Sequence, residues 1–196
     1  MSVIYYTATT LDGFLADPDD SLDWLLRQPQ EEHGPNDYGE FFAGVGAIVM
    51  GSTTYEWVLD HEKGSWPYEI PAWVMTHRDL PQPAAVAGAE SGSAPGAAPD
   101  IRFSSAAIPE VHAQMCEAAG ERDLWVVGGG DLAGQFADAG LLDEIHTSIA
   151  PIVLGAGRPL LPRRLDLELI ETGRNGAFVT ARHRVAGPLL EDRPSP

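Results

Sequence analysis

The sequence predicts an α/β fold in which helices cover both faces of a mostly parallel sheet that ends in an antiparallel hairpin. Short apolar runs alternate with helical segments, and the runs IVMG at 48–51 and LWVVG at 124–128 are typical of strands buried on both faces. The last two strand candidates have no helix between them. They flank RNGA at 174–177, a turn of the Asn-Gly type that favours a hairpin.

The strand candidates are rich in β-branched and aromatic residues and are bounded by Gly, Pro or Asp. They lie at residues 3–9, 47–50, 72–76, 101–103, 124–127, 144–151, 165–172 and 177–185.

The helix candidates fall between these strands. The segment 107–119 carries Ile108, Val111, Met115 and Ala118 at helical spacing, and Gly120 marks its end. The full set of predicted helices is 21–26, 38–43, 53–59, 107–119 and 132–139.

A chain of 196 residues with 44% apolar composition is long enough to bury a substantial core. We expect a single domain at 1–187 and a flexible tail at 188–196. Residues 82–100 consist mostly of Ala, Gly, Pro and Ser, which bury too little apolar surface to form a core. This segment is expected to be a surface loop within the domain.

The charge balance excludes several classes of protein. Twelve basic and 29 acidic residues give a net charge of −17, which argues against nucleic-acid and anionic-membrane partners. No apolar run approaches the roughly 18 residues of a membrane span, and the N-terminus does not resemble a signal peptide. Cys116 is the only cysteine, so an internal disulfide is excluded. We expect a cytoplasmic protein.

A glycine triplet carries the strongest functional signal. In DLWVVGGGDLAGQF, at 123–136, a buried strand leads into Gly128-Gly129-Gly130 and then a helix. Glycines let a ligand approach the backbone, and free amides at a helix N-terminus suit a pyrophosphate. The alternative is a tight turn. Gly128, Gly130 and Ala133 also match the Rossmann pattern G-x-G-x-x-A, but the match comes late in the chain, and the next strand has no acidic residue near its end.

Two further candidate phosphate sites also follow buried strands. Gly51 precedes Ser52, Thr53 and Thr54 at the start of a helix, where the alternative is ordinary N-capping. Thr76-His77-Arg78 offers a hydroxyl, an imidazole and a guanidinium, where the alternative is a solvated strand end. Because ligands of open α/β sheets bind at the carboxyl ends of strands, we expect all three sites to serve one ligand.

These motifs, in this order, resemble the dihydrofolate reductase fold, and especially the reductase domain of the riboflavin-biosynthesis deaminase–reductase group. The resembling stretches are TATTLDGFLA, LDWLL, AIVMGSTTYEW, AWVMTHRDLP and the segment 124–162. The similarity covers most of residues 3–185. It implies a three-layer αβα architecture around a mixed sheet.

The resemblance also implies NADPH as the cofactor. Gly51 to Thr54, together with Gly128, Gly129, Gly130, Asp131, Leu132 and Ala133, would hold its pyrophosphate. Thr76, His77 and Arg78 would meet the adenosine 2′-phosphate. Ala8 and the loop 12–16 would lie near the nicotinamide, and the Gly128–Gly129 bond is often cis in this family.

A reduced C=N bond needs hydride on carbon and a proton on nitrogen. The resemblance places the responsible carboxylate on the first helix, where Asp23 is the nearest match, and Thr147 beside it. Asp23 is alternatively a first-turn acid that stabilises the helix dipole. Asp12 is a competitor, although Asp-Gly favours a turn.

The expected activity is NADPH-dependent reduction of a small pyrimidine- or pterin-like heterocycle. The family's Trp-containing loop is not recognisable here, which disfavours a folate substrate. Arg158 is a candidate contact for a substrate phosphate, or a surface arginine of a loop. The alternative functions are a non-catalytic or regulatory nucleotide-cofactor-binding protein and a flavin reductase.

The histidines show no metal-ligand spacing, so no metal is expected. Related domains are often dimers, which implies a homodimer joined through the late antiparallel strands. Because the chain is acidic, we also expect a small positive potential at the three phosphate sites within a negative surface.

Overall fold

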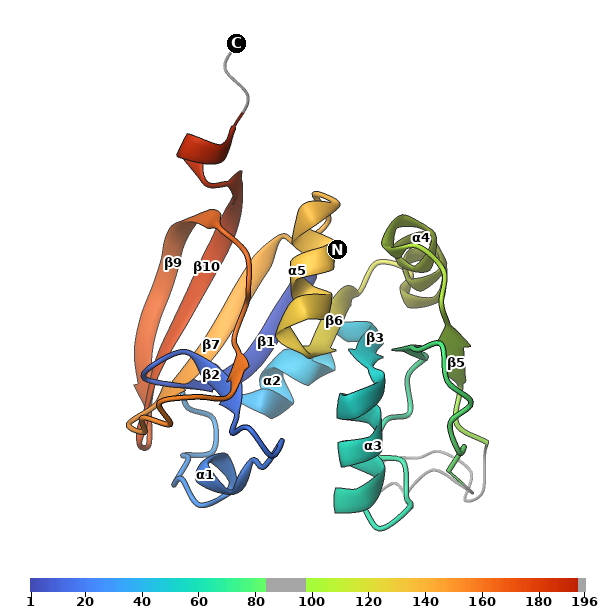
Figure 1. The fold of residues 1–196 in the computed structure, drawn as a ribbon, viewed down its shortest axis with the longest axis horizontal. Coiled ribbons are helices and arrows are strands. Elements are labelled where there is room, and N and C mark those ends of the chain that lie inside the picture. Colours follow the sequence, from blue (N-terminus) through green and yellow to red (C-terminus); the bar gives the residue numbers. More distant parts are fainter. Residues whose placement is uncertain (84–97, 194–196) are drawn as a thin grey trace.

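The computed structural model describes residues 1–83 and 98–193 (Figure 1). Most of the loop expected at 82–100, namely 84–97, and the last three residues of the expected tail lie outside the described residues. The strands are β1 (Val3–Thr10), β2 (Phe14–Ala16), β3 (Val45–Gly51), β4 (Ala72–Met75), β5 (Ile101–Ser104), β6 (Asp123–Gly128), β7 (Glu144–Ala150), β8 (Arg158–Pro159), β9 (Leu165–Asn175) and β10 (Phe178–Pro188).

The helices fall between the strands, as the alternating pattern predicts. They are α1 (Asp23–Leu26), α2 (Tyr38–Ala43), α3 (Ser52–His61), α4 (Ile108–Ala119), α5 (Gly130–Asp138) and a 3₁₀ turn, η1 (Leu190–Asp192). Among the described residues, no helix has the length and apolar character that crossing a membrane requires.

Within the described residues, eight strands form one sheet in the order β5-β4-β3-β6-β1-β7-β10-β9. All neighbours from β5 to β7 pair in parallel, whereas β10 is antiparallel to both β7 and β9. The predicted mixed sheet with a C-terminal antiparallel hairpin is therefore confirmed. The parallel pairing also brings the carboxyl ends of β1, β3, β4 and β6 to the same edge of the sheet.

The sheet is covered on both faces, which gives three layers (Figure 1). On one face, α4 and α5 pack through Val111, Met115 and Phe136. On the other, α2 and α3 contribute aromatic and aliphatic side chains, among them Tyr55 and Val58. Successive residues of the buried strands face opposite layers, which explains why these strands are continuously apolar rather than alternating.

The turn of the C-terminal hairpin is shorter than the segment 174–177 that the sequence predicted. Asn175 pairs with Phe178, so the two turn residues are Gly176, at φ +56°, and Ala177. Asn175 is therefore the last residue of β9 and not a turn residue, and its side chain makes contacts outside the hairpin. Its amide accepts a hydrogen bond from the Glu31 N–H at 2.7 Å and donates one to the Pro35 carbonyl, and so ties the loop before α2 to the hairpin.

Three differences from the predicted elements lie near the carboxyl ends of the parallel strands. One of them is a separate two-stranded sheet, β2-β8. The short pair β2 and β8 has no clear sequence signal, because three- and two-residue strands are too short for an alternating pattern. The first helix is limited to Asp23–Leu26. Helix α5 begins at Gly130, inside the glycine triplet, rather than at 132.

Candidate functional site

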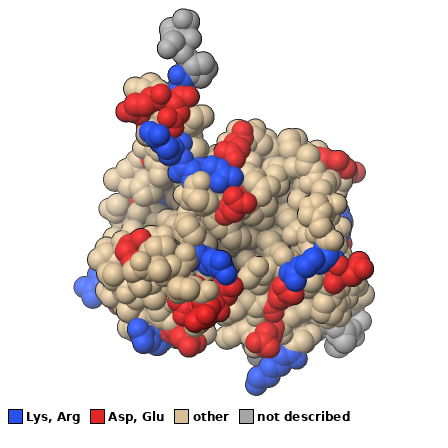
Figure 2. All heavy atoms as spheres, in the orientation of Figure 1, with Lys and Arg blue, Asp and Glu red and all other residues tan. Residues whose placement is uncertain are grey.

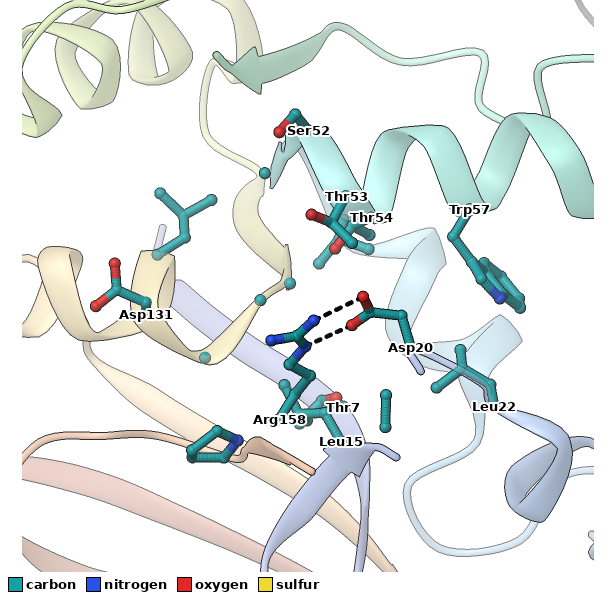
Figure 3. Close-up of a pocket in the computed structure, with 18 of the residues that line it drawn as sticks. Thr7, Leu15, Asp20, Leu22, Ser52, Thr53, Thr54, Trp57, Asp131 and Arg158 are labelled. Atoms are coloured by element: carbon teal, nitrogen blue, oxygen red, sulfur yellow. Dashed lines mark hydrogen bonds and ion pairs between the residues drawn. The ribbon is translucent and has the colours of Figure 1, made fainter. Parts of the chain in front are cut away.

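A cavity of about 600 Å³ lies at the carboxyl edge of β1, β3 and β6. Its lining comes from segments far apart in the sequence, which the parallel sheet brings together (Figure 3). They are the end of β1 with β2, the segment from Asp20 into α1, the start of α3, the end of β4, the glycine triplet with the start of α5, and β8 with the residues after it. Two of the three predicted phosphate sites therefore open into one cavity.

The first of these sites is the N-terminus of α3. Gly51 is the N-cap residue and makes no side-chain capping bond, so the first-turn amides have no capping side chain as acceptor. Ser52, Thr53 and Thr54 line the cavity beside those amides (Figure 3). The predicted alternative, N-capping by a hydroxyl, does not occur at this helix start. The arrangement leaves amide and hydroxyl donors for an anion.

The second site is the glycine triplet between β6 and α5. The Gly128–Gly129 peptide bond is cis, as the resemblance implied. A Cβ on Gly130 would collide with the carbonyls of Pro159 and Leu160, so close backbone packing requires glycine there. A Cβ on Gly129 would meet no atom within 4 Å, because that position faces open space.

Helix α5 continues this second site. Its N-cap is Gly129, again without a side-chain capping bond. Asp131 and Leu132 line the cavity, whereas Ala133 is fully buried and packs into the core. Of the predicted residues of this segment, Ala133 alone does not line the cavity, because its helical position directs it toward the sheet.

The third predicted site lies beyond one end of the cavity. Met75, the last residue of β4, lines the cavity, but Thr76, His77 and Arg78 do not. The Thr76 hydroxyl accepts a hydrogen bond from the Arg78 N–H at 2.9 Å. The Arg78 guanidinium forms a two-bond ion pair with Glu56 of α3, at 2.6 and 3.2 Å, and both side chains are exposed.

The predicted catalytic pair is not brought together at the cavity. Asp23 is exposed at the start of α1, and its N–H is bonded to the Ser21 hydroxyl. The buried residue of that helix is Trp24. Thr147 is buried in β7 and donates to the Ala181 carbonyl of β10 at 3.3 Å. Neither side chain lines the cavity, and their catalytic roles stay predictions that the geometry does not support.

Asp12, the competing acid, has a structural environment. Its carboxylate accepts a hydrogen bond from the Thr10 hydroxyl at 2.6 Å and further bonds from the N–H groups of Leu154 and Gly155. These bonds, with that from Thr10 the strongest, lower the pKa of Asp12. Asp12 thus fixes the turn after β1 to the loop after β7.

The sequence reasoning missed Asp20, a second carboxylate that lines the cavity besides the predicted Asp131. Asp20 stands at φ +63° in the loop after β2 and forms a two-bond ion pair with Arg158 of β8 (Figure 3). The distances are 2.6 Å from Arg158 Nε and 2.8 Å from Nη2. This ion pair holds the pKa of Asp20 below its usual value. The sequence signal at this position is the acidic run DPDD at 17–20, whose residue types are typical of helix N-caps.

An apolar group of side chains lines the cavity on the side of α1 and α3. Leu22 and Leu25 come from α1 and the residue before it, and Trp57 comes from the second turn of α3 (Figure 3). The Trp57 indole stacks on His61, with ring centroids 4.7 Å apart and planes at 11°. Flat apolar side chains of this kind suit a planar ring.

The charged groups on the cavity lining are few and paired. Among the described lining residues they are Asp20, Asp131 and Arg158, and Asp131 lies 3.1 Å from Arg163. Around the hollow at the centre of this face, acidic and basic side chains alternate (Figure 2). The expected positive potential at the phosphate sites stays a prediction.

Comparison with known proteins gives a consistent result. The family model described as the RibD C-terminal domain matches residues 1–176. The uncharacterized Bacillus subtilis protein YwjB is 30% identical over 159 residues, which are 80% of either chain. The riboflavin biosynthesis protein RibD of Corynebacterium ammoniagenes is 29% identical over 164 residues, which are 81% of this chain and 45% of RibD.

A solved structure from Shewanella sp. PV-4, which carries a provisional riboflavin-biosynthesis name, has a TM-score of 0.74 and 26% identity. The similarity covers 94% of this chain and 99% of that one.

Proposed function

The chain belongs to the RibD C-terminal domain family, and from this premise we propose that it is an NADPH-dependent reductase of a small pyrimidine- or pterin-like heterocycle. The supporting observation is that the N-termini of α3 and α5, both without capping side chains, border one cavity. Gly129 leaves open space between them. These features fit a pyrophosphate, which needs several N–H donors and close approach to the backbone.

The proposed cofactor position follows from the arrangement of these donors. The amides of the first turns of α3 and α5 would hold the pyrophosphate, with the hydroxyls of Ser52, Thr53 and Thr54 beside it. Ala8 lines the cavity near the end of β1, where the nicotinamide would lie. When bound, the reduced nicotinamide would supply a hydride to a carbon of the substrate.

The adenosine 2′-phosphate would be recognised outside the cavity by Thr76, His77 and Arg78. Met75 supports this proposal, because it ends β4, which pairs with β3, and it lines the cavity directly before Thr76. Arg78 would have to leave Glu56 to bind the phosphate. The cost is small, because exposed ion pairs contribute only about 0–1 kcal/mol.

We propose water as the source of the proton. Asp20 is the lining carboxylate nearest the apolar group, but its pairing with Arg158 lowers its pKa and makes it a poor acid at neutral pH. We propose that the substrate nitrogen takes its proton from water in the cavity, while the adjacent carbon takes the hydride. Leu22, Leu25 and Trp57 would position the ring between these two sources.

Turnover tests this proposal directly. The protein is mixed with NADPH and a panel of dihydropterins, aminopyrimidines and flavins, and the loss of nicotinamide absorbance is followed. Saturable oxidation with a pterin or pyrimidine supports the proposal, whereas saturable oxidation with flavins alone identifies a flavin reductase.

A second candidate function is a nucleotide-cofactor-binding protein that performs no reduction. It is favoured by the position of Asp23, which is exposed and does not line the cavity. Tight NADPH binding without oxidation in the presence of any panel member would support this candidate against the reductase.

We further propose that two copies of the chain associate through the β9–β10 hairpin. Strand β9 is one of the two edge strands of the sheet that the described residues form, and Leu167, Leu169 and Val179 of the hairpin are exposed. Exposed apolar side chains on a long edge strand are typical of an interface.

A further inference from the structure

We infer that Arg163 is a positioning residue for the cofactor, because it neutralises and holds Asp131, a carboxylate beside the proposed pyrophosphate position. This inference rests on the proposed function and adds to it a residue outside the cavity lining. Arg163 follows β8 along the chain and acts through Asp131, which does line the cavity.

Asp131 has opposite effects on the helix and on an anion. It is the acidic residue in the first turn of α5, where a carboxylate stabilises the positive end of the helix dipole. The first-turn amides of this helix are also those proposed to hold the pyrophosphate, and a carboxylate beside them repels a phosphate. Asp131 lines the cavity with 69% of its side chain exposed (Figure 3). Its charge therefore needs a partner if the cavity is to hold an anion.

Arg163 is that partner. Its Nη2 donates to Asp131 Oδ1 at 3.1 Å, its Nε donates to Asp138 Oδ2 at 2.7 Å, and its Nη1 donates to the Pro162 carbonyl at 2.9 Å. The second oxygen of Asp131 accepts a bond from the Gln135 side-chain amide at 3.0 Å. Each guanidinium nitrogen thus has an acceptor, and both oxygens of Asp131 have a donor.

Helix α5 provides the space in which Arg163 lies. A Cβ on Gly134 would be 2.9 Å from both Cγ and Cζ of Arg163, so the side chain packs directly against the helix backbone. Glycine is unfavourable inside a helix, but here it leaves the room that the arginine fills. Only 26% of the Arg163 side chain is exposed, whereas 69% of Asp131 and 56% of Asp138 are. The arginine is therefore the better fixed partner, and it holds Asp131.

The positions of its partners direct the Asp131 carboxylate along the helix. Gln135 lies one turn further along α5, and the guanidinium of Arg163 lies over Gly134. The carboxylate is thus held toward the second turn of α5. Without Arg163, it would compete with the pyrophosphate for the first-turn amides and would repel the phosphates.

Paired substitutions test this role by titration of the full chain with NADPH and NADH. Arg163→Gln should weaken the binding of both cofactors alike, about three- to fivefold, because both carry the same pyrophosphate. Asp131→Asn added to Arg163→Gln should restore the affinity. Asp138→Asn added to Arg163→Gln should not, because Asp138 does not line the cavity. The control is Arg164→Gln, which removes the same charge from the adjacent residue, paired with Asp192 at 3.2 Å, and should leave both affinities unchanged.

Ionic strength provides a readout that a purely structural role would not move. The loss caused by Arg163→Gln should be larger at low than at high salt, because salt screens the repulsion between Asp131 and the pyrophosphate. Wild-type affinity in Arg163→Gln would overturn the inference. Equal rescue by Asp131→Asn and Asp138→Asn, or an equal loss in Arg164→Gln, would overturn it as well.

The same titrations separate this inference from the proposed function. A wild type that binds neither cofactor would contradict the reductase proposal. A wild type that binds NADPH, with an Arg163→Gln variant that binds it equally well, would contradict only the role of Arg163.

Discussion

In the proposed function, the exposed ion pair of Arg78 and Glu56 would set the preference between NADPH and NADH. Arg78 is the only guanidinium of the predicted 2′-phosphate site, and in the structure it is bonded to Glu56 at 2.6 Å. The 2′-phosphate of NADPH would compete with Glu56 for the same two-bond geometry. NADH has no such group, so the pair should affect the affinity for NADPH only.

We predict that Arg78→Ala weakens NADPH binding about tenfold, or ~1.4 kcal/mol, and leaves NADH binding nearly unchanged. Glu56→Gln should have the opposite effect and tighten NADPH binding a few-fold, because Arg78 no longer needs to leave a partner. Fluorescence titrations of both cofactors measure this. Equal losses for NADPH and NADH in Arg78→Ala would remove the 2′-phosphate role.

Sequence reasoning found most residues of the cavity that follow strands, but it did not find the Asp20–Arg158 pair. Gly51 to Thr54 and Gly128 to Leu132 are recognisable because a buried strand followed by glycine or hydroxyl residues fixes their place at the sheet edge. Asp20 and Arg158 are 138 positions apart, and both lie in irregular segments or very short strands. Only the packing of β2 on β8 brings them together.

At the scale of elements, the glycine triplet contains one glycine that the fold requires and one that the proposed cofactor binding would require. Gly130 cannot carry a Cβ, because the carbonyls of Pro159 and Leu160 lie against it, whereas Gly129 faces open space. Substituting Gly129 and Gly130 one at a time therefore tests cofactor binding and folding separately.

We predict that Gly129→Ala weakens NADPH binding at least about tenfold, because its methyl group enters the space of the pyrophosphate. Gly130→Ala should instead destabilise the protein, by roughly 1–3 kcal/mol or more, because a methyl group is forced against backbone. Urea denaturation and NADPH titration of both variants measure the two effects. A Gly129→Ala protein that folds and binds NADPH with full affinity would show that the triplet is only a turn.

Strand β7 carries a buried titratable group away from the cavity. His146 is bonded to Glu144 at 2.8 Å, and Arg182 of β10 lies 3.3 Å from the same carboxylate. Burial lowers the pKa of His146, although the bond to Glu144 opposes the shift. Burial alone would raise the pKa of Glu144, but the hydrogen bonds from His146 and Arg182 outweigh it and lower that pKa.

The lowered pKa of His146 predicts acid sensitivity. As the pH falls through about 6.5, the unfolded chain gains a proton at this residue before the folded chain does, so stability decreases. His146→Gln should therefore show a smaller loss of stability between neutral and mildly acidic pH than the wild type. Urea midpoints measured across this range provide the test, and identical pH dependence in both proteins would contradict it.

The order of the elements was predictable, but their ends and the smallest strands were not. Buried apolar runs and turn residues located the main strands and helices, because burial on two faces leaves a strong composition signal. The start of α5 inside the glycine triplet and the pair β2–β8 depend on tertiary contacts, such as the approach of Leu160 to Gly130. The turn also differs from the predicted one, because Asn175 pairs with Phe178 and its side chain binds the loop before α2.

At the scale of the whole molecule, the exposed β9–β10 hairpin predicts self-association. Leu169 is 62% exposed in an edge strand of eleven residues, which a monomer rarely leaves uncovered. We expect a dimer in sedimentation equilibrium at micromolar concentrations. Leu169→Glu should shift it to a monomer, whereas Val153→Glu, at an equally exposed apolar residue outside the hairpin, should not. A wild type that sediments as a monomer would refute the proposed interface.

Because the net charge is −17, cofactor binding is the property of the whole molecule that tests the proposed function most strictly. A chain this acidic repels a dinucleotide phosphate unless amides, hydroxyls and single arginines are arranged to hold it. In the proposed function, the two uncapped helix starts and the open space at Gly129 would provide such an arrangement.

Titration of the wild-type protein with NADPH, followed by nicotinamide fluorescence, tests this claim most directly. We predict saturable binding at one site per chain, tighter for NADPH than for NADH and weakened in Gly129→Ala. The absence of saturable binding for both cofactors would contradict the claim that this cavity is a cofactor site.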